Sequence, residues 1–348
     1  MVDLKNRFIS PSLSIIEVFR LMDNLDKKLL IIIEGDKFVG LISAGDIQRA
    51  IIQNKPYNTP IKEILRKNIR VAKPQNSFDE IREMMLDYRM ELCPVINETN
   101  EIVNVYFWED IFQGKKTVPL KQFNLDVVIM AGGFGTRLKP LTNVLPKPLI
   151  SIGDKTMLED IFERFGNHGC STFLISVNYK ADLIEYYIKN KNLPYRLHFF
   201  KEEIPMGTAG SLSLLKGKIN NTFFVSNCDN LIEQDYSEIL DYHLSNKNEI
   251  TVVAALKHYP IAYGTIETAE NGRLLKLTEK PDLTIKINSG MYILEPHLID
   301  EIPKNKLTHI THLIERIVER NGKVGVFPVS EKSWKDVGDW GEYIKYIK

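Results

Sequence analysis

The chain has 348 residues, 44% of them hydrophobic and 26% charged, which predicts a globular protein of about two domains. Because 45 basic side chains balance 45 acidic ones, we expect partners other than nucleic acid or an anionic membrane, which bind through an excess of basic charge. The sequence has no apolar run long enough for a membrane-spanning helix, no signal-peptide core and only three scattered cysteines, so we expect a cytoplasmic protein.

The first 118 residues contain two copies of one pattern, at about residues 8–55 and 72–115. Each copy opens with a serine ahead of apolar residues at helical spacing, because a serine hydroxyl accepts the unpaired amides of a first helical turn: Ser12 and Ser77. Strand-like runs follow at 29–33, 38–42, 93–96 and 102–105. An acidic residue then opens another helix: Asp46 and Asp110. Two packed copies of one supersecondary unit are the simplest interpretation.

The repeat resembles a tandem pair of CBS modules, most strongly over residues 40–47. This resemblance implies an α/β module in which Ser43 and Asp46 hold the ribose of an adenine nucleotide, since a carboxylate accepts both ribose hydroxyls. Phe107 stands in the second copy where Ser43 stands in the first, so we expect at most one nucleotide site. The alternative is that Ser43 and Asp46 only cap a helix.

A polar stretch that contains Gly114 and Pro119 predicts a linker, which we place at residues 119–123. Beyond it, strand-like runs lie at 126–130, 172–177, 197–201, 223–226 and 250–256. Helical stretches lie between them, at 157–167, 181–189 and 209–215. Strands that alternate with helices predict an α/β domain over residues 124–348, with a Rossmann-like, mostly parallel sheet that binds ligands at the carboxyl ends of its strands.

The first of these strands runs into a glycine loop that ends at Arg137. Its three glycines, Gly132, Gly133 and Gly135, let backbone amides approach an anion with no side chain in the way. Arg137 adds a planar donor fork for phosphate oxygens, and Lys147 adds a second cation ten residues later. The spacing differs from both the dinucleotide-binding fingerprint and the Walker loop.

The segment from Gly133 to Pro148 is similar to the signature of sugar-1-phosphate nucleotidyltransferases, and the resemblance extends over residues 124–348. It implies that the loop binds the nucleotide through Ala131, Gly132, Gly133, Gly135 and Thr136. Asp229 and Asp336 resemble the two ligands of the family's Mg²⁺. The sugar phosphate is expected to contact Gly264, Glu279, Lys280, Asn288 and Gly290.

These residue types suit a reaction in which two phosphates must meet. The attacking phosphate is already ionised near neutral pH, so the site needs cations and positioning more than a base. We expect Arg137 to neutralise the departing pyrophosphate, and Lys147 and Lys280 to hold the sugar phosphate. Asp229 and Asp336 would hold Mg²⁺, with Asp339 as a competitor for the second position. Thr142 is expected to be structural.

The resemblance implies that residues 202–210, with Gly207 and Thr208, face the base and the sugar, and that Glu202 selects the base. A carboxylate accepts hydrogen bonds and donates none, whereas guanine offers two adjacent donors, so we predict GTP rather than UTP or dTTP. The alternative is that Glu202 points to solvent and Glu203 or the backbone contacts the base.

A CBS pair ahead of such a domain resembles the bacterial glucosamine-1-phosphate guanylyltransferases of legionaminic acid synthesis. We therefore expect transfer of GMP to glucosamine 1-phosphate. Mannose or heptose 1-phosphate as acceptor, and uridylyl or thymidylyl transfer, are the alternatives. A hypothesis from another class is a nucleotide sensor that binds without turnover. We also expect a homo-oligomer.

Overall fold

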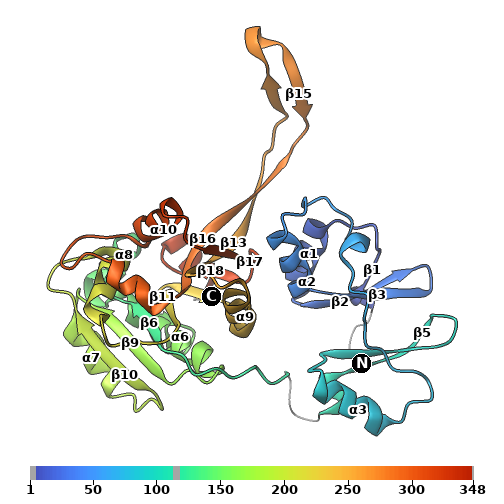
Figure 1. The fold of residues 1–348 in the computed structure, drawn as a ribbon, viewed down its shortest axis with the longest axis horizontal. Helices are drawn as coiled ribbons and strands as arrows, with labels where there is room; N and C mark the ends of the chain where they lie inside the picture. The colour runs from blue at the N-terminus through green and yellow to red at the C-terminus, as the bar shows by residue number, and fades with distance from the viewer. Residues whose placement is uncertain (1–4, 113–117, 347–348) are drawn as a thin grey trace. The chain divides into compact units, whose positions relative to one another are not determined.

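The computed structural model describes residues 5–112 and 118–346. They form two compact units, of which the first ends at Lys121 and the second begins at Gln122 (Figure 1). Residues 113–117, at which the polar linker stretch begins, lie outside the described residues. Among the helices of the described part, none is long and apolar enough to cross a membrane.

The first unit repeats one order of elements, helix–strand–strand–helix (Figure 1). The first copy consists of α1 (Ile15–Leu25), β2 (Leu29–Glu34), β3 (Lys37–Ser43) and α2 (Ala44–Ile52), with β1 (Phe8–Ile9) paired in parallel to β2. The second consists of α3 (Phe78–Asp87), β4 (Leu92–Ile96), β5 (Ile102–Phe107) and α4 (Trp108–Ile111). Capping boxes begin α1 at Ser14 and α3 at Ser77, so the first helix starts two residues later than Ser12 predicts.

The two copies share a hydrophobic core, because neither can cover its own strands alone. Ile31 and Leu41 of the first copy pack in one cluster with Leu92, Val105 and Phe107 of the second. The backbone amide of Phe38 also donates to the carbonyl of Asn100 at 2.7 Å. The repeat predicted from the sequence is therefore one packed module.

The second unit is built on a seven-stranded sheet in the order β10-β9-β6-β11-β16-β13-β17. These strands are β10 (Arg196–Lys201), β9 (Thr172–Val177), β6 (Val127–Met130), β11 (Phe223–Asn227), β16 (Asp282–Leu294), β13 (Ile250–Pro260) and β17 (Val324–Val329). β10, β9, β6 and β11 are parallel, β16 is antiparallel to both neighbours, and β13 pairs in parallel with β17. The mostly parallel sheet is confirmed.

The helices and smaller sheets of this unit complete the α/β pattern. The helices are α5 (Leu141–Val144), α6 (Met157–Gly166), α7 (Ala181–Lys189), α8 (Gly207–Gly210), α9 (Tyr236–Asn246), α10 (Ile310–Glu319) and α11 (Trp340–Tyr343). The short strands pair as β7 (Ser151–Ile152) with β8 (Lys155–Thr156), β12 (Asn230–Ile232) with β18 (Trp334–Asp336), and β14 (Thr265–Thr268) with β15 (Leu274–Thr278). The helix predicted over 209–215 is split between α8 and a 3₁₀ turn, Ser211–Leu215.

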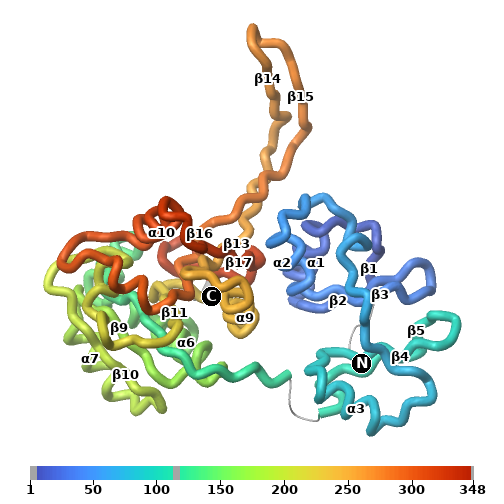
Figure 2. The backbone as a smooth tube through the Cα atoms, in the orientation of Figure 1, coloured from blue at the N-terminus to red at the C-terminus, as the bar shows by residue number. Residues whose placement is uncertain are grey.

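Two strands continue past the sheet as a ribbon (Figure 2). β13 and β16 remain paired from Leu256 with Lys286 to Pro260 with Asp282, and the β14–β15 hairpin lies at the tip. We call residues 256–286 the arm. At the foot of the arm the register shifts between Val252 and Ala254, which is the mark of a β-bulge.

Candidate functional site

The glycine loop follows β6 at the carboxyl edge of the sheet. Gly135 has a φ of 62°, and a Cβ there would lie 2.7 Å from the methyl carbon of Thr142. The Thr142 hydroxyl donates to the Gly135 carbonyl at 2.9 Å, which confirms its structural role. A Cβ on Gly132 would lie 3.0 Å from a carboxylate oxygen of Glu202, whereas a Cβ on Gly133 would meet nothing within 4 Å. The loop is thus tightly packed at Gly135, whereas there is free space beside Gly133.

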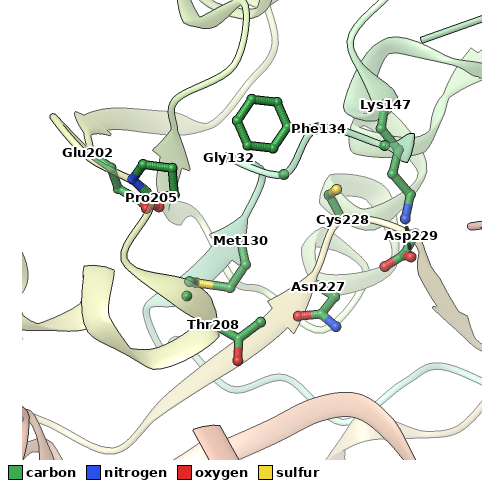
Figure 3. A pocket seen from close by; sticks show the side chains of 13 residues that line it. Met130, Gly132, Phe134, Lys147, Glu202, Pro205, Thr208, Asn227, Cys228 and Asp229 are labelled. Atoms are coloured by element: carbon green, nitrogen blue, oxygen red, sulfur yellow. Dashed lines mark hydrogen bonds and ion pairs between the residues drawn. The ribbon is translucent and has the colours of Figure 1, made fainter. Parts of the chain in front are cut away.

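A cavity of about 290 Å³ opens beside this loop (Figure 3). Eight of the predicted site residues line it: Gly132, Gly133, Gly135, Lys147, Glu202, Gly207, Thr208 and Asp229. In Figure 3, Glu202 lies at one end and Lys147 with Asp229 at the other. The pocket therefore has a carboxylate end, suited to a hydrogen-bond donor, and a charged end, suited to phosphates and a cation.

The charged end joins residues far apart in the sequence. Lys147 forms an ion pair with Asp229, and Arg137 lies 3.6 Å from Asp229 and 3.5 Å from Asp336. β12 and β18 bring the two acids together, because Asn230 is the register partner of Asp336. The backbone amide of Val337 also donates to the Asp229 carbonyl at 3.2 Å.

Gly338 lies at the centre of this cluster. A Cβ there would be 2.5 Å from an oxygen of Asp229, 2.7 Å from one of Asp336 and 2.8 Å from a nitrogen of Arg137. Mg²⁺ is commonly bound by one or two carboxylates together with phosphate oxygens of the substrate. The residues present therefore fit the expected metal.

Asp339, the expected competitor for the second metal position, has another role. Its carboxylate accepts from the backbone amide of Glu342 at 3.1 Å and caps α11. Asp336, rather than Asp339, lies beside Arg137 and Gly338. The geometry therefore favours Asp336 as the second ligand.

Glu202 is buried, and its carboxylate is oriented by two donors. The Ser176 hydroxyl donates to one oxygen, and the Met206 amide donates to the other at 2.9 Å. With 6% of its surface exposed, Glu202 faces the pocket, so the alternative in which it points to solvent is wrong. Glu203 is the exposed neighbour.

Some predicted nucleotide contacts lie elsewhere. Ala131 is buried, and its amide donates to the Ser176 carbonyl at 3.0 Å, so this amide continues the sheet and does not face a ligand. Thr136 begins a 3₁₀ turn and is not among the residues that line the pocket.

The residues expected to bind the sugar phosphate fall into two groups, one in the sheet and one in the arm. Gly290 lies in the sheet against Asn227, a pocket residue, and its amide donates to the Asn288 side chain at 3.0 Å. Gly264, Glu279 and Lys280 lie in the outer half of the arm, beyond the last β13–β16 pair. At ~3.3 Å per residue, Asp282, where β16 begins, stands ~20 Å along the strand from Asn288, and Lys280 precedes it by two residues. The structure therefore does not bring these three to the pocket.

Sequence reasoning missed several residues that line the pocket: Met130, Phe134, Pro205, Asn227 and Cys228. Asn227 could have been inferred, because it ends β11 two residues before Asp229. Burial raises the pKa of the Cys228 thiol to about 12, so this cysteine stays protonated and unreactive. The apolar residues of the pocket carry no polar or charged group by which the sequence could have marked them as part of a site.

In the first unit, Ser43 and Asp46 form the capping box of α2. The Asp46 carboxylate accepts from the Ser43 amide at 2.8 Å and pairs with Arg49 at 2.5 Å and Arg66 at 3.0 Å. The helix-cap alternative thus describes what both residues do in this structure. Phe107 starts α4 with no side-chain cap, in keeping with the difference between the copies.

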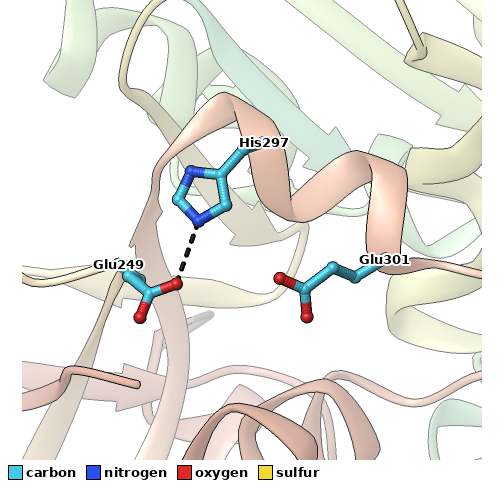
Figure 4. A group of neighbouring side chains, drawn as sticks. All are labelled: Glu249, His297 and Glu301. Carbon is cyan, nitrogen blue, oxygen red and sulfur yellow. Dashed lines mark hydrogen bonds and ion pairs between the residues drawn. The ribbon is translucent and has the colours of Figure 1, made fainter. Parts of the chain in front are cut away.

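A second acidic cluster lies at Glu249, His297 and Glu301, whose ligand atoms are within 4.8 Å of one another (Figure 4). Arg320 pairs with Glu249 at 2.5 Å and with Glu301 at 2.7 Å, and the His297 ring lies 2.9 Å from Glu249. The guanidinium already pairs with both carboxylates, so we assign no metal here.

This cluster predicts a pH-dependent contribution to stability. Arg320 lowers the pKa of Glu249 to about 2, so the pair stabilises the fold above the ordinary Glu pKa of ~4.3 and ceases to do so as the pH falls through about 2. Because Arg320 is 39% exposed and water screens the pair, we expect Arg320→Ala to lower the free energy of unfolding only slightly at pH 7. Urea unfolding at pH 7, 5 and 3 measures this difference, and one that is as large at pH 3 as at pH 7 contradicts the assignment.

Comparison with known proteins finds a family match in each of the two units. Residues 126–348 match the family model described as nucleotidyl transferase, and residues 4–53 match that of the CBS domain. The chain is 32% identical over 227 residues to the mannose-1-phosphate guanylyltransferase catalytic subunit beta of Dictyostelium discoideum, covering 63% of each protein. It is 33% identical over 226 residues to the mannose-1-phosphate guanyltransferase of Saccharomyces cerevisiae, covering 62% of each. The aligned chain thus spans less than two thirds of these relatives.

Among solved structures, HddC from Yersinia pseudotuberculosis is 28% identical with a TM-score of 0.50, covering 64% of this chain and 97% of HddC. HddC complexed with GMP-PN matches with 27% identity, a TM-score of 0.50 and the same coverage. A putative glucose-1-phosphate thymidylyltransferase from Bacillus anthracis has a TM-score of 0.52 over 64% of this chain and 93% of that one. At 19% identity, this structural likeness shows a shared fold alone.

Proposed function

The chain belongs to the nucleotidyl transferase family, and from that premise we propose that it transfers GMP from GTP to a sugar 1-phosphate and releases pyrophosphate. The observation that carries this proposal is the meeting of Asp229, Asp336, Arg137 and Lys147 at one end of the pocket. A sensor that only binds nucleotide has no need for two acids and two cations around one point, so catalysis is the better explanation.

The reaction follows from these charges. A phosphate oxygen of the sugar 1-phosphate attacks the α-phosphorus of GTP, and the bond to the bridging β-phosphate oxygen breaks. Lys147 holds the attacking phosphate near the α-phosphate, and Arg137 balances the charge of the pyrophosphate that leaves. Mg²⁺, held by Asp229 and Asp336, would reduce the repulsion between the phosphates.

Glu202 supports guanine as the base. Its buried carboxylate can accept the two adjacent donors of guanine, and it lies at the end of the pocket away from Asp229 (Figure 3). The HddC structure with GMP-PN supports the same choice, because that relative is complexed with a guanine nucleotide analogue.

We expect Glu202→Gln to reduce the preference for GTP over UTP by about tenfold, because the new amide group places a donor where guanine also donates. Values of kcat/KM for GTP, UTP, CTP and dTTP measure the effect. Glu203→Gln is the matched control, because Glu203 is exposed beside the same segment. A changed preference in the control with none in Glu202→Gln would move base selection to Glu203.

The relatives favour mannose 1-phosphate as the acceptor over glucosamine 1-phosphate, since both curated relatives are named for mannose. We therefore propose mannose 1-phosphate first, with glucosamine and heptose 1-phosphates as the other candidates. Pyrophosphate release, measured for each of four nucleotides with each of these sugar phosphates, tests both the proposed base and the proposed sugar. The highest kcat/KM with UTP or dTTP would reject guanylyl transfer, and no turnover with any pair would favour the sensor.

For the first unit we propose an adenine nucleotide as ligand near Asp46, supported by the CBS match and by Arg49 and Arg66, whose guanidinium groups suit phosphates. We expect calorimetry on the full chain to detect AMP or ATP at submillimolar affinity. Asp46→Asn keeps a helix-capping side chain and should weaken binding about tenfold. Asp110→Asn, in the second copy, is the control. No heat at millimolar ligand would leave the module an assembly role only.

A further inference from the structure

Ser176 places a hydroxyl where the pattern of its strand favours an apolar side chain. Side chains along β9 alternate between the two faces of the sheet, so Ser176 shares a face with Leu174, which belongs to the hydrophobic core. None of the surface of Ser176 is exposed. A buried hydroxyl costs free energy unless it is hydrogen-bonded, so the partner of this serine indicates its role.

That partner is the carboxylate of Glu202. The Ser176 hydroxyl donates to Oε1 of Glu202, and the Met206 amide donates to Oε2 at 2.9 Å. The backbone of Glu202 is fixed as well, because its amide donates to the Val177 carbonyl at 3.0 Å and its carbonyl accepts from the Asn178 side chain at 2.8 Å. The residue is therefore held at its backbone and at both carboxylate oxygens.

The carboxylate of Glu202 keeps acceptor capacity for a ligand. Its two oxygens offer about four lone-pair sites, and the two donors named above take one on each oxygen. A Cβ on Gly132 would lie 3.0 Å from Oε1, so this glycine leaves space beside that oxygen. Glu202 and Gly132 both line the pocket (Figure 3). Because both protein donors are neutral and the carboxylate is buried, a ligand that brings further donors stabilises it.

We propose that Ser176 is a positioning residue through which the pocket selects guanine by both its N1–H and its 2-amino group. The inference rests on the proposed function, in which guanine is the base. Guanine presents these two donors on adjacent atoms, which matches the two oxygens of one carboxylate. The terminal bond of a glutamate side chain turns easily, and two donors fix its rotation. Without the Ser176 hydroxyl only Oε2 is held, and the second donor of guanine loses its aligned partner.

Inosine triphosphate isolates that second donor, because hypoxanthine keeps the N1–H of guanine and lacks the 2-amino group. We expect the wild-type chain to prefer GTP over inosine triphosphate by about 10²-fold in kcat/KM, since the analogue leaves one oxygen of a buried carboxylate without its donor. Ser176→Ala removes one oxygen atom from a core position and should reduce this preference by about tenfold. The assay uses the sugar 1-phosphate that the wild-type chain turns over fastest.

Ser211→Ala is the matched control. Ser211 is also fully buried, but its hydroxyl contacts the sulfur of Met130, another pocket residue, at 3.8 Å. We expect this variant to keep the wild-type preference for GTP. Equal use of the two nucleotides by the wild-type chain overturns the proposal. So does an unchanged preference in Ser176→Ala, even with a slower rate, because that result shows a structural role only.

Nucleotide binding separates this inference from the reaction on which it rests. We expect calorimetry on the full chain with Mg²⁺ to show that GDP binds at least tenfold more tightly than inosine diphosphate, and that Ser176→Ala reduces the difference. The same difference in a chain that releases no pyrophosphate rejects the proposed transfer and supports the role of Ser176. Guanylyl transfer by a chain that binds both diphosphates equally overturns the role of Ser176 alone.

Discussion

The Asp229→Asn variant is expected to release pyrophosphate about 10³-fold more slowly than the wild-type chain, while folding normally. The substitution keeps the size of the side chain and removes the charge that Lys147 and Arg137 contact. It also removes one of two carboxylates available to Mg²⁺, and the loss of such preorganised charge costs about 10²- to 10³-fold in rate. A coupled pyrophosphate assay with GTP and mannose 1-phosphate measures the change.

Asp339→Asn is the matched control for this variant. It makes the same chemical change three residues after Asp336, and asparagine caps a helix as well as aspartate does, so α11 should persist. We expect its rate to stay within about twofold of the wild type. Equal rates for Asp229→Asn and the wild type would remove the catalytic assignment, and a loss confined to Asp339→Asn would move the second ligand to that residue.

The Gly338→Ala variant is expected to lose about 10²-fold in kcat, although it adds one methyl group. That methyl would lie 2.5 to 2.8 Å from Asp229, Asp336 and Arg137, so the two acids or the guanidinium must move. A displacement of about 1 Å in positioned catalytic groups costs about this factor. Steady-state kinetics measures the loss, and a changed Mg²⁺ dependence would place the displacement at the carboxylates.

Gly341→Ala is the comparison for Gly338. It lies in α11 three residues later, and its nearest neighbour to an added Cβ is an oxygen of Asp339 at 3.3 Å. Alanine favours a helix over glycine, so we expect normal activity and no loss of stability. Wild-type rates in Gly338→Ala would show that the space around Gly338 has no part in the reaction.

The local pattern of the sequence was sufficient for most elements of the fold. The buried run at 172–177 is β9 and the helical stretch at 181–189 is α7, because apolar spacing and strand length are local properties. The loop after β6 and Asp229 after β11 are brought together because parallel strands end at one edge of the sheet. The mostly parallel sheet and the repeat of the first unit follow from the same reasoning.

The sequence was least informative where a residue's neighbours come from distant parts of the chain. Ala131 carries the same sequence signal as its glycine neighbours, but its amide is bonded to the sheet at Ser176. Asp46 matches a ribose ligand in sequence, but its contacts with Arg66 and with the start of α2 are visible only in the structure. Lys280 matches a sugar-phosphate motif, although the ribbon carries it away from the pocket.

For this protein, the sequence by itself determined the two units, the glycine loop, the kinds of charge at the site and the family to which the second unit belongs. Only the tertiary structure decided that Glu202 faces the pocket, that Gly338 lies between the two acids and that the arm leaves the sheet. Helix and strand patterns depend on neighbours along the chain, which a sequence displays. Register, bulges and the packing of segments over a hundred residues apart depend on long-range contacts, which appear only when the chain is folded.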